Sequence, residues 1–166
     1  MKILSIDPGY DKVGYAIFEI PGNPKQSEGS RNRDFKFIRS DLIKTNTKDP
    51  HEVRLKQVYD MLDQTIKLHK IDMAIIEQLF FFKNKKTVIK VAQSLGVIEV
   101  VMANNGVEIK RLTPLQIKQA VTGNGTADKQ SVQKMIRLEL GDAITFKDDD
   151  ESDAVACGLA YIYTRC

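Results

Sequence analysis

The sequence predicts an α/β fold: one mixed five-stranded sheet, made of an antiparallel meander plus parallel strands and flanked by helices. Two observations lead to this prediction. Three strand-like segments come first with no helical pattern between them, which is typical of a meander. Later apolar segments alternate with helical patterns, which favours right-handed crossovers and parallel strands. With 166 residues, 42% of them hydrophobic, we expect residues 1–166 to form a single domain.

The first expected strand ends on a carboxylate. Residues 3–6 are apolar and rich in β-branched side chains, as in a strand buried on both faces, and Asp7 follows them directly. Pro8-Gly9 is a strong turn signal, so residues 13–18 are expected to pair back as a hairpin. Asp7 could by itself be either a turn-starting residue or a functional one.

A third strand and a long helix are expected next. Residues 21–33 have the composition of a loop, and residues 35–43 alternate well enough to complete the meander. Asp49-Pro50 is expected to cap a helix that ends near residue 69. Two histidines near its ends are expected on the surface, without a metal. The apolar stripe of this helix would consist of Val53, Leu55, Val58, Leu62, Ile66 and Leu68, and the histidines are His51 and His69.

A second buried strand also ends on a carboxylate. Residues 71–76 are mostly apolar and lead into Glu77. A right-handed crossover would make this strand parallel to the first one, so that Glu77 and Asp7 reach the same edge of the sheet. In open α/β sheets, active sites form at that edge.

Aromatic and basic side chains follow Glu77. Rings that stack on bases and lysines that bind phosphate suit nucleic acid, although the rings could equally belong to the core. A helix over 86–103 is apolar around most of its circumference, so a second subunit could cover it. The aromatic and basic residues are Phe80, Phe81, Phe82, Lys83, Lys85 and Lys86.

The remaining elements are a strand over 107–112 and helices over 114–121, 126–140 and 150–163. Ten Lys and Arg face three acids between residues 83 and 137, whereas seven acids face one lysine between residues 138 and 153. This distribution suggests a surface for a polyanion beside a cation site. Ordinary solvated surface is the alternative.

Spacing connects the acids to a metal. Asp150 and Asp153 are three residues apart on one helical face, and that helix could pack where Asp7 and Glu77 end their strands. Converging carboxylates need cations, and hard oxygen ligands favour Mg²⁺ or Mn²⁺. Two such ions roughly 4 Å apart are suited to in-line displacement at phosphate.

Three blocks of residues occur in order along the chain, and together they resemble the RuvC-type Holliday junction resolvases, bacterial or phage-encoded. The resemblance implies a ribonuclease H-like fold, a homodimer and Mg²⁺-dependent cutting of branched DNA. It places the four acidic positions on Asp7, Glu77, Asp150 and Asp153. The blocks are Ile6-Asp7-Pro8-Gly9 with Gly14-Tyr15, Ile76-Glu77-Gln78 followed by Phe80 and Lys83-Asn84, and Asp150 to Ala156.

The resemblance also assigns residues to DNA. Lys118 and Lys129 match lysines near the cleaved strand, and Phe80 matches an aromatic residue at the junction. The loop over 21–33 is longer than in compact bacterial members. Asp149 remains an alternative to Asp150 as the third carboxylate, because it would also share a face with Asp153.

Other functions stay open at this point. These are a catalytically inactive branched-DNA binding module, a YqgF-like RNA-processing nuclease of the same fold, and, from the spacing of Asp7 and Gly14, a sugar-kinase-type ATPase. No segment has the features of a membrane span or a signal peptide, and the two cysteines are expected to be reduced. We therefore expect a cytoplasmic protein, in a bacterium or in a phage host. The sequence leaves open whether branch-migration motor proteins act with it.

Overall fold

The computed structural model describes residues 1–21, 35–78 and 85–165, without the side chains of 85–87. Its sheet has five strands in the order β3-β2-β1-β4-β5. Strands β1, β2 and β3 pair antiparallel, whereas β4 pairs parallel with β1, and β5 with β4. The predicted mixed sheet is confirmed. Its strands are β1 (Lys2–Asp7), β2 (Lys12–Glu19), β3 (Lys36–Lys44), β4 (Met73–Glu77) and β5 (Glu108–Leu112).

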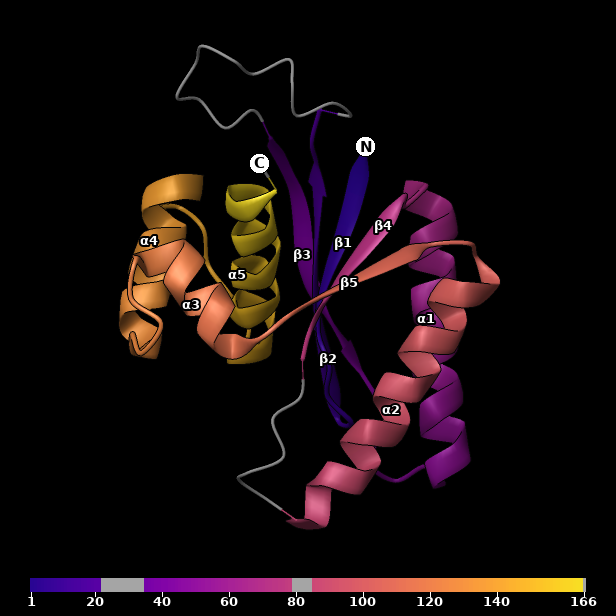
Figure 1. Cartoon of the computed structure of the whole chain (residues 1–166). Coiled ribbons are helices and arrows are strands. Elements are labelled where there is room, and N and C mark those ends of the chain that lie inside the picture. Colours follow the sequence, from indigo (N-terminus) through magenta and orange to yellow (C-terminus); the bar gives the residue numbers. More distant parts are fainter. Residues whose placement is uncertain (22–34, 79–84, 166) are drawn as a thin grey trace.

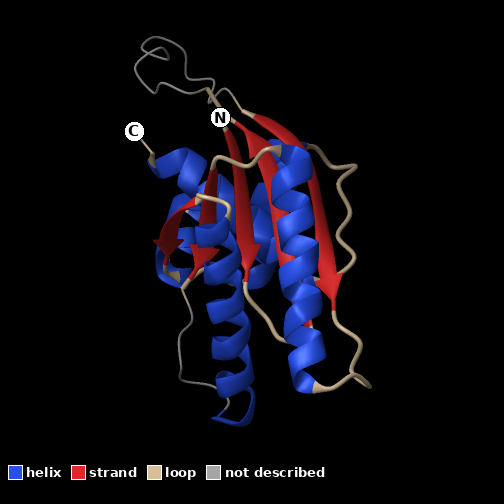
Figure 2. Ribbon diagram, turned by 90° about the vertical axis from the view of Figure 1, so that its right-hand side faces the viewer, coloured by secondary structure: helices blue, strands red, loops and turns tan. Residues whose placement is uncertain are grey.

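Helices cover both faces of the sheet. In Figure 1 the sheet is seen nearly edge-on, with α1 and α2 on its right and α3, α4 and α5 on its left. Figure 2 looks onto the layer of α1 and α2, which lies across the strands. Within the described residues, no helix is long and apolar enough to cross a membrane. The helices are α1 (His51–His69), α2 (Lys85–Asn104), α3 (Pro114–Thr122), α4 (Lys129–Leu140) and α5 (Asp149–Thr164).

Strand alternation divides the core in two and decides where the acids point. Leu4 and Ile6 of β1 pack with α1 and α2, whereas Ile3 packs with α3, α4 and α5. Because successive side chains of a strand point to opposite faces, Asp7 lies on the same face as Ile3. The same alternation along β4 places Glu77 on the same face as Ile75, which also packs toward α5.

Side chains cap the N-termini of α3, α4 and α5, but not that of α1. The Thr113 side chain accepts a hydrogen bond from the Gln116 backbone N–H and forms a capping box, and Asp128 accepts one from Ser131. The prediction that Asp49 caps α1 is wrong, because Pro50 is the N-cap and makes no side-chain bond there. The carboxylate of Asp49 is instead bonded to Gln57 and Asn46.

The predicted apolar stripe of α1 is too wide. Val58, Leu62 and Ile66 are buried, whereas Val53 and Leu68 are exposed. Arg54 is buried in their place and is paired with the Asp11 carboxylate. His51 also departs from the surface position expected for it, because its Nδ1 lies 2.7 Å from the Tyr10 hydroxyl and its Nε2 is buried. The sequence does not predict the burial of Arg54, because its partner Asp11 lies in a turn that is distant along the chain.

Candidate active site

Three elements bring the four predicted acids to one edge of the sheet. Ile6 pairs with Ile76, so Asp7 and Glu77 each follow that pair at adjacent strand ends. Helix α5 begins at the same edge, which is the lower one in Figure 1. Asp150 and Asp153 lie in its first turns. The predicted convergence is therefore present in the fold.

Gly14 sets the distance between α5 and the sheet. A Cβ atom on Gly14 would lie 1.9 Å from the Asp150 carbonyl oxygen and 2.5 Å from its carbon. Since only hydrogen fits there, the helix backbone rests directly on β2. Gly14 also pairs with Asp7 across the strands. One residue thus fixes Asp150 relative to Asp7.

We expect Gly14→Ala to lower catalytic activity at least tenfold, because the backbone of Asp150 must move away from Asp7. Displacements near 1 Å can cost on the order of a hundredfold in rate. Activity per folded molecule, normalised by circular dichroism, measures the effect. An unchanged rate with normal folding would show that the Asp7–Asp150 spacing is not critical.

Burial and neighbouring negative charge raise the pKa of three of these acids, Asp7, Glu77 and Asp150. Burial, followed by the charges of Glu77, Asp153 and Asp150, raises the pKa of Asp7 to about 8. Burial and Asp153 raise the pKa of Glu77 to about 7, against the opposing charges of Lys118 and Lys129. Burial also raises the pKa of Asp150, with Asp148 adding to it. Lys118 and Lys129 therefore offset only part of the negative charge that the site would carry with its carboxylates ionised.

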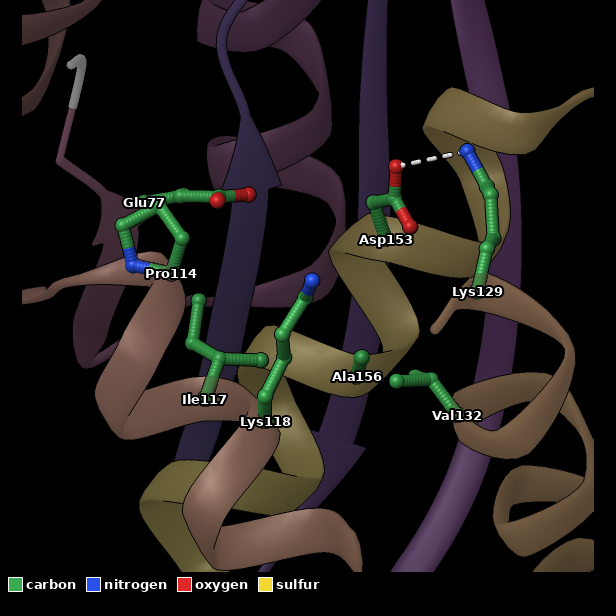
Figure 3. A pocket seen from close by; sticks show the side chains of 8 residues that line it. All are labelled: Glu77, Pro114, Ile117, Lys118, Lys129, Val132, Asp153 and Ala156. Atoms are coloured by element: carbon green, nitrogen blue, oxygen red, sulfur yellow. Dashed lines mark hydrogen bonds and ion pairs between the residues drawn. The ribbon is translucent and has the colours of Figure 1, made fainter. Parts of the chain in front are cut away.

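Two lysines stand at a cavity of about 200 Å³ beside Glu77 and Asp153. Figure 3 shows Glu77 and Asp153 on opposite sides of the cavity, with Lys118 of α3 between them and the Asp153 carboxylate turned toward Lys129. Lys129 donates a hydrogen bond to Asp153 at 3.0 Å. Burial disfavours the charge on Lys129, yet the bonds and charges of Asp153 and Asp149 raise its pKa overall. Lys118 has no ion pair with a described residue, so its charge is available to a ligand.

The acids of α5 have different surroundings. Asp150 is half-buried and acts on the pKa of Asp7. Asp149 is exposed and lies 3.2 Å from Lys129. Of the two alternatives, the geometry thus favours Asp150 as the third carboxylate. Glu151 is buried and accepts hydrogen bonds from the Ser40 hydroxyl at 2.7 Å and from the Lys147 N–H at 2.8 Å.

The carboxylate oxygens of the four acids are the kind of ligand that a hard divalent cation prefers. In this structure, however, the four side chains are not close enough together to surround a metal ion. Among the described residues, no three His, Cys, Asp or Glu side chains form a group that could hold one. Asp153 is bonded to Lys129, which supplies positive charge in their midst. Asp7, Glu77 and Asp150 nevertheless have a raised pKa, partly because of neighbouring carboxylates, and Mg²⁺ or Mn²⁺ would neutralise such a group of charges. A cation held there would compete with Lys129 for Asp153.

The other predicted DNA-binding residues cannot be placed from the structure. Phe80 and Lys83 lie outside the described residues. Lys85 and Lys86 begin α2, and their side chains are outside the description as well. Their assignment to DNA stays a prediction. Cys157 of α5 is fully buried in the core and is a free thiol.

Sequence reasoning missed a link between the two halves of the site. The Lys12 ammonium, at the start of β2, is paired with the carboxylate of Asp148. Asp148 in turn caps α5 by accepting a hydrogen bond from the Asp149 N–H at 2.8 Å. This pair joins the turn after Asp7 to the helix that carries Asp150. A lysine three residues after Pro-Gly, together with an acid before the last helix, was the only signal in the sequence.

Comparison with known proteins decides the family. Residues 3–161 match the family model described as "Crossover junction endodeoxyribonuclease RuvC". The chain belongs to the RuvC family. It is 40% identical over 161 residues to the protein of that name from Brachyspira hyodysenteriae, covering 97% of this chain and 93% of the relative. It is 42% identical over 161 residues to the one from Aliarcobacter butzleri, with 97% of each chain covered.

Solved structures of RuvC proteins share the fold. The Thermus thermophilus RuvC structure superposes with a TM-score of 0.84 at 25% identity, covering 99% of this chain and 96% of that one. T. thermophilus RuvC in complex with Holliday junction substrate gives a TM-score of 0.85 at 22% identity, covering 99% and 94%. The fowlpox virus resolvase in its junction complex reaches 0.59 at 16% identity, covering 96% and 97%. The predicted ribonuclease H-like fold is confirmed.

Proposed function

We propose that this protein is a Holliday junction resolvase, an endodeoxyribonuclease that cuts the phosphodiester backbone of branched DNA. The observation that carries the proposal is the meeting of Asp7, Glu77, Asp150 and Asp153 at one sheet edge in a chain of the RuvC family. A relative with this family name is matched over nearly its full length. All four carboxylates are present, which argues against an inactive junction-binding module.

The proposed cofactor is Mg²⁺, two ions in each active site, with Mn²⁺ as a substitute. Asp7, Glu77, Asp150 and Asp153 would hold the ions through their oxygens. When bound, such ions activate water and stabilise the leaving oxygen of an in-line displacement at phosphorus. The buried strand ends keep Asp7 and Glu77 fixed for this task, since both lie in the rigid centre of the sheet. Lys118 faces the same cavity and would bind the phosphate of the strand being cut.

The test is incubation of a labelled synthetic four-way junction with the protein, with and without Mg²⁺. We expect paired nicks near the branch point only when Mg²⁺ is present, and no cutting of a linear duplex with the same sequence. Equal cutting of RNA hairpins and junction DNA would instead favour the YqgF-like alternative. Binding without cutting in Mg²⁺ or Mn²⁺ would favour the inactive module.

Lys118 and Lys129 should contact phosphate. We expect Lys118→Gln or Lys129→Gln to weaken junction binding and to reduce the slope of log K against log salt by about one charge each. Fluorescence anisotropy over a salt series measures this. Lys56→Gln is the matched control, because Lys56 is 72% exposed on α1, away from the acids. A lost cleavage rate with an unchanged slope would make these lysines catalytic or structural instead.

A homodimer is proposed through the exposed stripe of α2. Ile89 and Val100 are 67% and 53% exposed, and Gly96 lies between them on the same helical face. Two sites related by two-fold symmetry match the two equivalent strands of a four-way junction. Exposed apolar side chains on this face suit burial against a second copy better than contact with solvent.

We expect the double variant Ile89→Glu/Val100→Glu to be monomeric by light scattering at micromolar concentration, and to cut junctions poorly, because buried carboxylates are costly. Leu138→Glu is the control, since Leu138 is also 67% exposed but lies on α4. A wild-type protein that is monomeric and fully active would overturn the dimer proposal.

A further inference from the structure

A second pocket lies beside Asp150. We name it the Tyr10 pocket. It has a volume of about 320 Å³ and is lined by the β1–β2 turn (Gly9–Lys12), by Lys90 and Val91 of α2, and by Asp150. It shares no lining residue with the cavity at Glu77 and Asp153. The acids therefore have one hollow on the side of α3 and α4 and another on the side of α2.

The floor of the Tyr10 pocket is held from several directions. The Tyr10 hydroxyl is 2.7 Å from His51 Nδ1, and the Arg54 guanidinium lies 4.0 Å from the centroid of the Tyr10 ring. Arg54 is itself only 7% exposed and donates hydrogen bonds to Thr45 at 2.9 and 2.7 Å and to Asp11. These contacts of the buried Arg54 keep the β1–β2 turn rigid directly after Asp7, which is more support than an ordinary surface turn needs.

Among the charged side chains that line the pocket, Lys90 is the one positive charge without an ion pair to a described residue. Lys12 is paired with Asp148, and Asp11 is paired with Arg54. The Lys90 ammonium lies 5.3 Å from the centroid of the Tyr10 ring and has no ion pair with any described residue. Asp150 is the remaining acid, and its charge is neutralised when a cation binds. The pocket then carries the net positive charge of Lys90.

We propose that the Tyr10 pocket is a second strand subsite, in which Lys90 binds a backbone phosphate that flanks the one being cut. The inference rests on the proposed function, since it takes the cut strand to run past Asp150 from the cavity at Lys118 to Lys90. The Tyr10 ring, which is only 9% exposed, lies at the floor of the pocket and positions the Lys90 ammonium for that phosphate. The rigid turn holds this contact in register with Asp7, so that a bound phosphate fixes which linkage meets the acids.

The test pairs one variant with neutral phosphates. A series of four-way junctions carries a single methylphosphonate, which removes one backbone charge, at successive positions counted from the branch point. Binding is measured by anisotropy in EDTA, where nothing is cut. We expect the wild type to lose about fivefold in affinity at one flanking position. Lys90→Gln should bind the unmodified junction about fivefold more weakly than the wild type does. A methylphosphonate at that flanking position should not weaken its binding further, whereas methylphosphonates at other positions should affect both proteins equally.

Lys67→Gln serves as the control, because Lys67 is also exposed, lies on α1 and lines neither pocket. Equal methylphosphonate effects in the wild type and Lys90→Gln at every position would overturn the inference. A normal affinity of Lys90→Gln for the unmodified junction would overturn it as well. Either result in a protein that still cuts junctions leaves the proposed function intact. A wild type that neither binds nor cuts junctions refutes the proposed function itself.

Discussion

Asp7→Asn and Glu77→Gln are each expected to reduce junction cleavage at least a hundredfold in Mg²⁺ while junction binding persists or becomes tighter. The two side chains keep their shapes but lose the charge that would hold divalent cations. Binding is retained because negative charge facing the DNA phosphates is removed. Both residues end buried strands, so no neighbouring acid can move into their positions.

Cleavage is measured in single-turnover assays, and binding by anisotropy on the same preparations. Asp149→Asn is the matched control, because Asp149 is exposed and lies toward Lys129 rather than Asp7. We expect it to keep cleavage within a few-fold of the wild type. Cleavage within tenfold of the wild type for either Asp7→Asn or Glu77→Gln would rule out the two-metal mechanism.

Without divalent cations, the protein should become less stable as the pH rises from 5 to 8. The pKa of Asp7 is about 8 in the folded chain and near 3.8 in the unfolded one, so the folded chain binds more protons in this interval. The free energy of unfolding therefore falls with rising pH. Over these three pH units Asp7 contributes about 4 kcal/mol, or a fall in Tm of roughly 10 °C. Glu77, with a pKa of about 7, acts in the same direction.

Thermal unfolding in EDTA measures this effect, and the difference between variants isolates Asp7. We expect Asp7→Asn to melt at higher temperature than the wild type at pH 8 and at a similar temperature at pH 5. Mg²⁺ should raise the wild-type Tm at pH 8 and have little effect on Asp7→Asn. Asp60→Asn is the control, because Asp60 is exposed on α1. Equal wild-type Tm values at pH 5 and pH 8 would contradict the prediction.

Most of the fold, and the sheet edge at which the acids lie, could be predicted from the sequence. Asp7 and Glu77 were predictable because each stops an apolar strand, and a crossover aligns the two strand ends. Helical spacing left Asp149 and Asp150 as alternatives beside Asp153, and the resemblance to the RuvC-type resolvases favoured Asp150. These signals are local and periodic, so they can be recognised without knowing how the elements pack.

What the sequence did not carry depends on contacts between distant segments. Arg54 occupies an ordinary helical position, and only its partner Asp11, which is 43 residues away, makes it part of the core. Glu151 sits within an acidic run, yet it is buried because Ser40 on β3 faces it. Lys90 is one of many lysines until the Tyr10 ring is placed beneath it. Patterns along a chain do not state which turn will meet which helix.

The position of α5 in the chain has a consequence for synthesis. Two of the four carboxylates lie on this helix, and it is the last element of the fold. A nascent chain can pair β1 with β4 and set Asp7 beside Glu77 well before residues 149–164 have been made. Such a chain holds only two of the four carboxylates proposed for cutting. We therefore expect cutting activity to appear only when α5 docks on Gly14, and a proteolytic fragment that ends before α5 to leave DNA uncut even if its sheet stays folded.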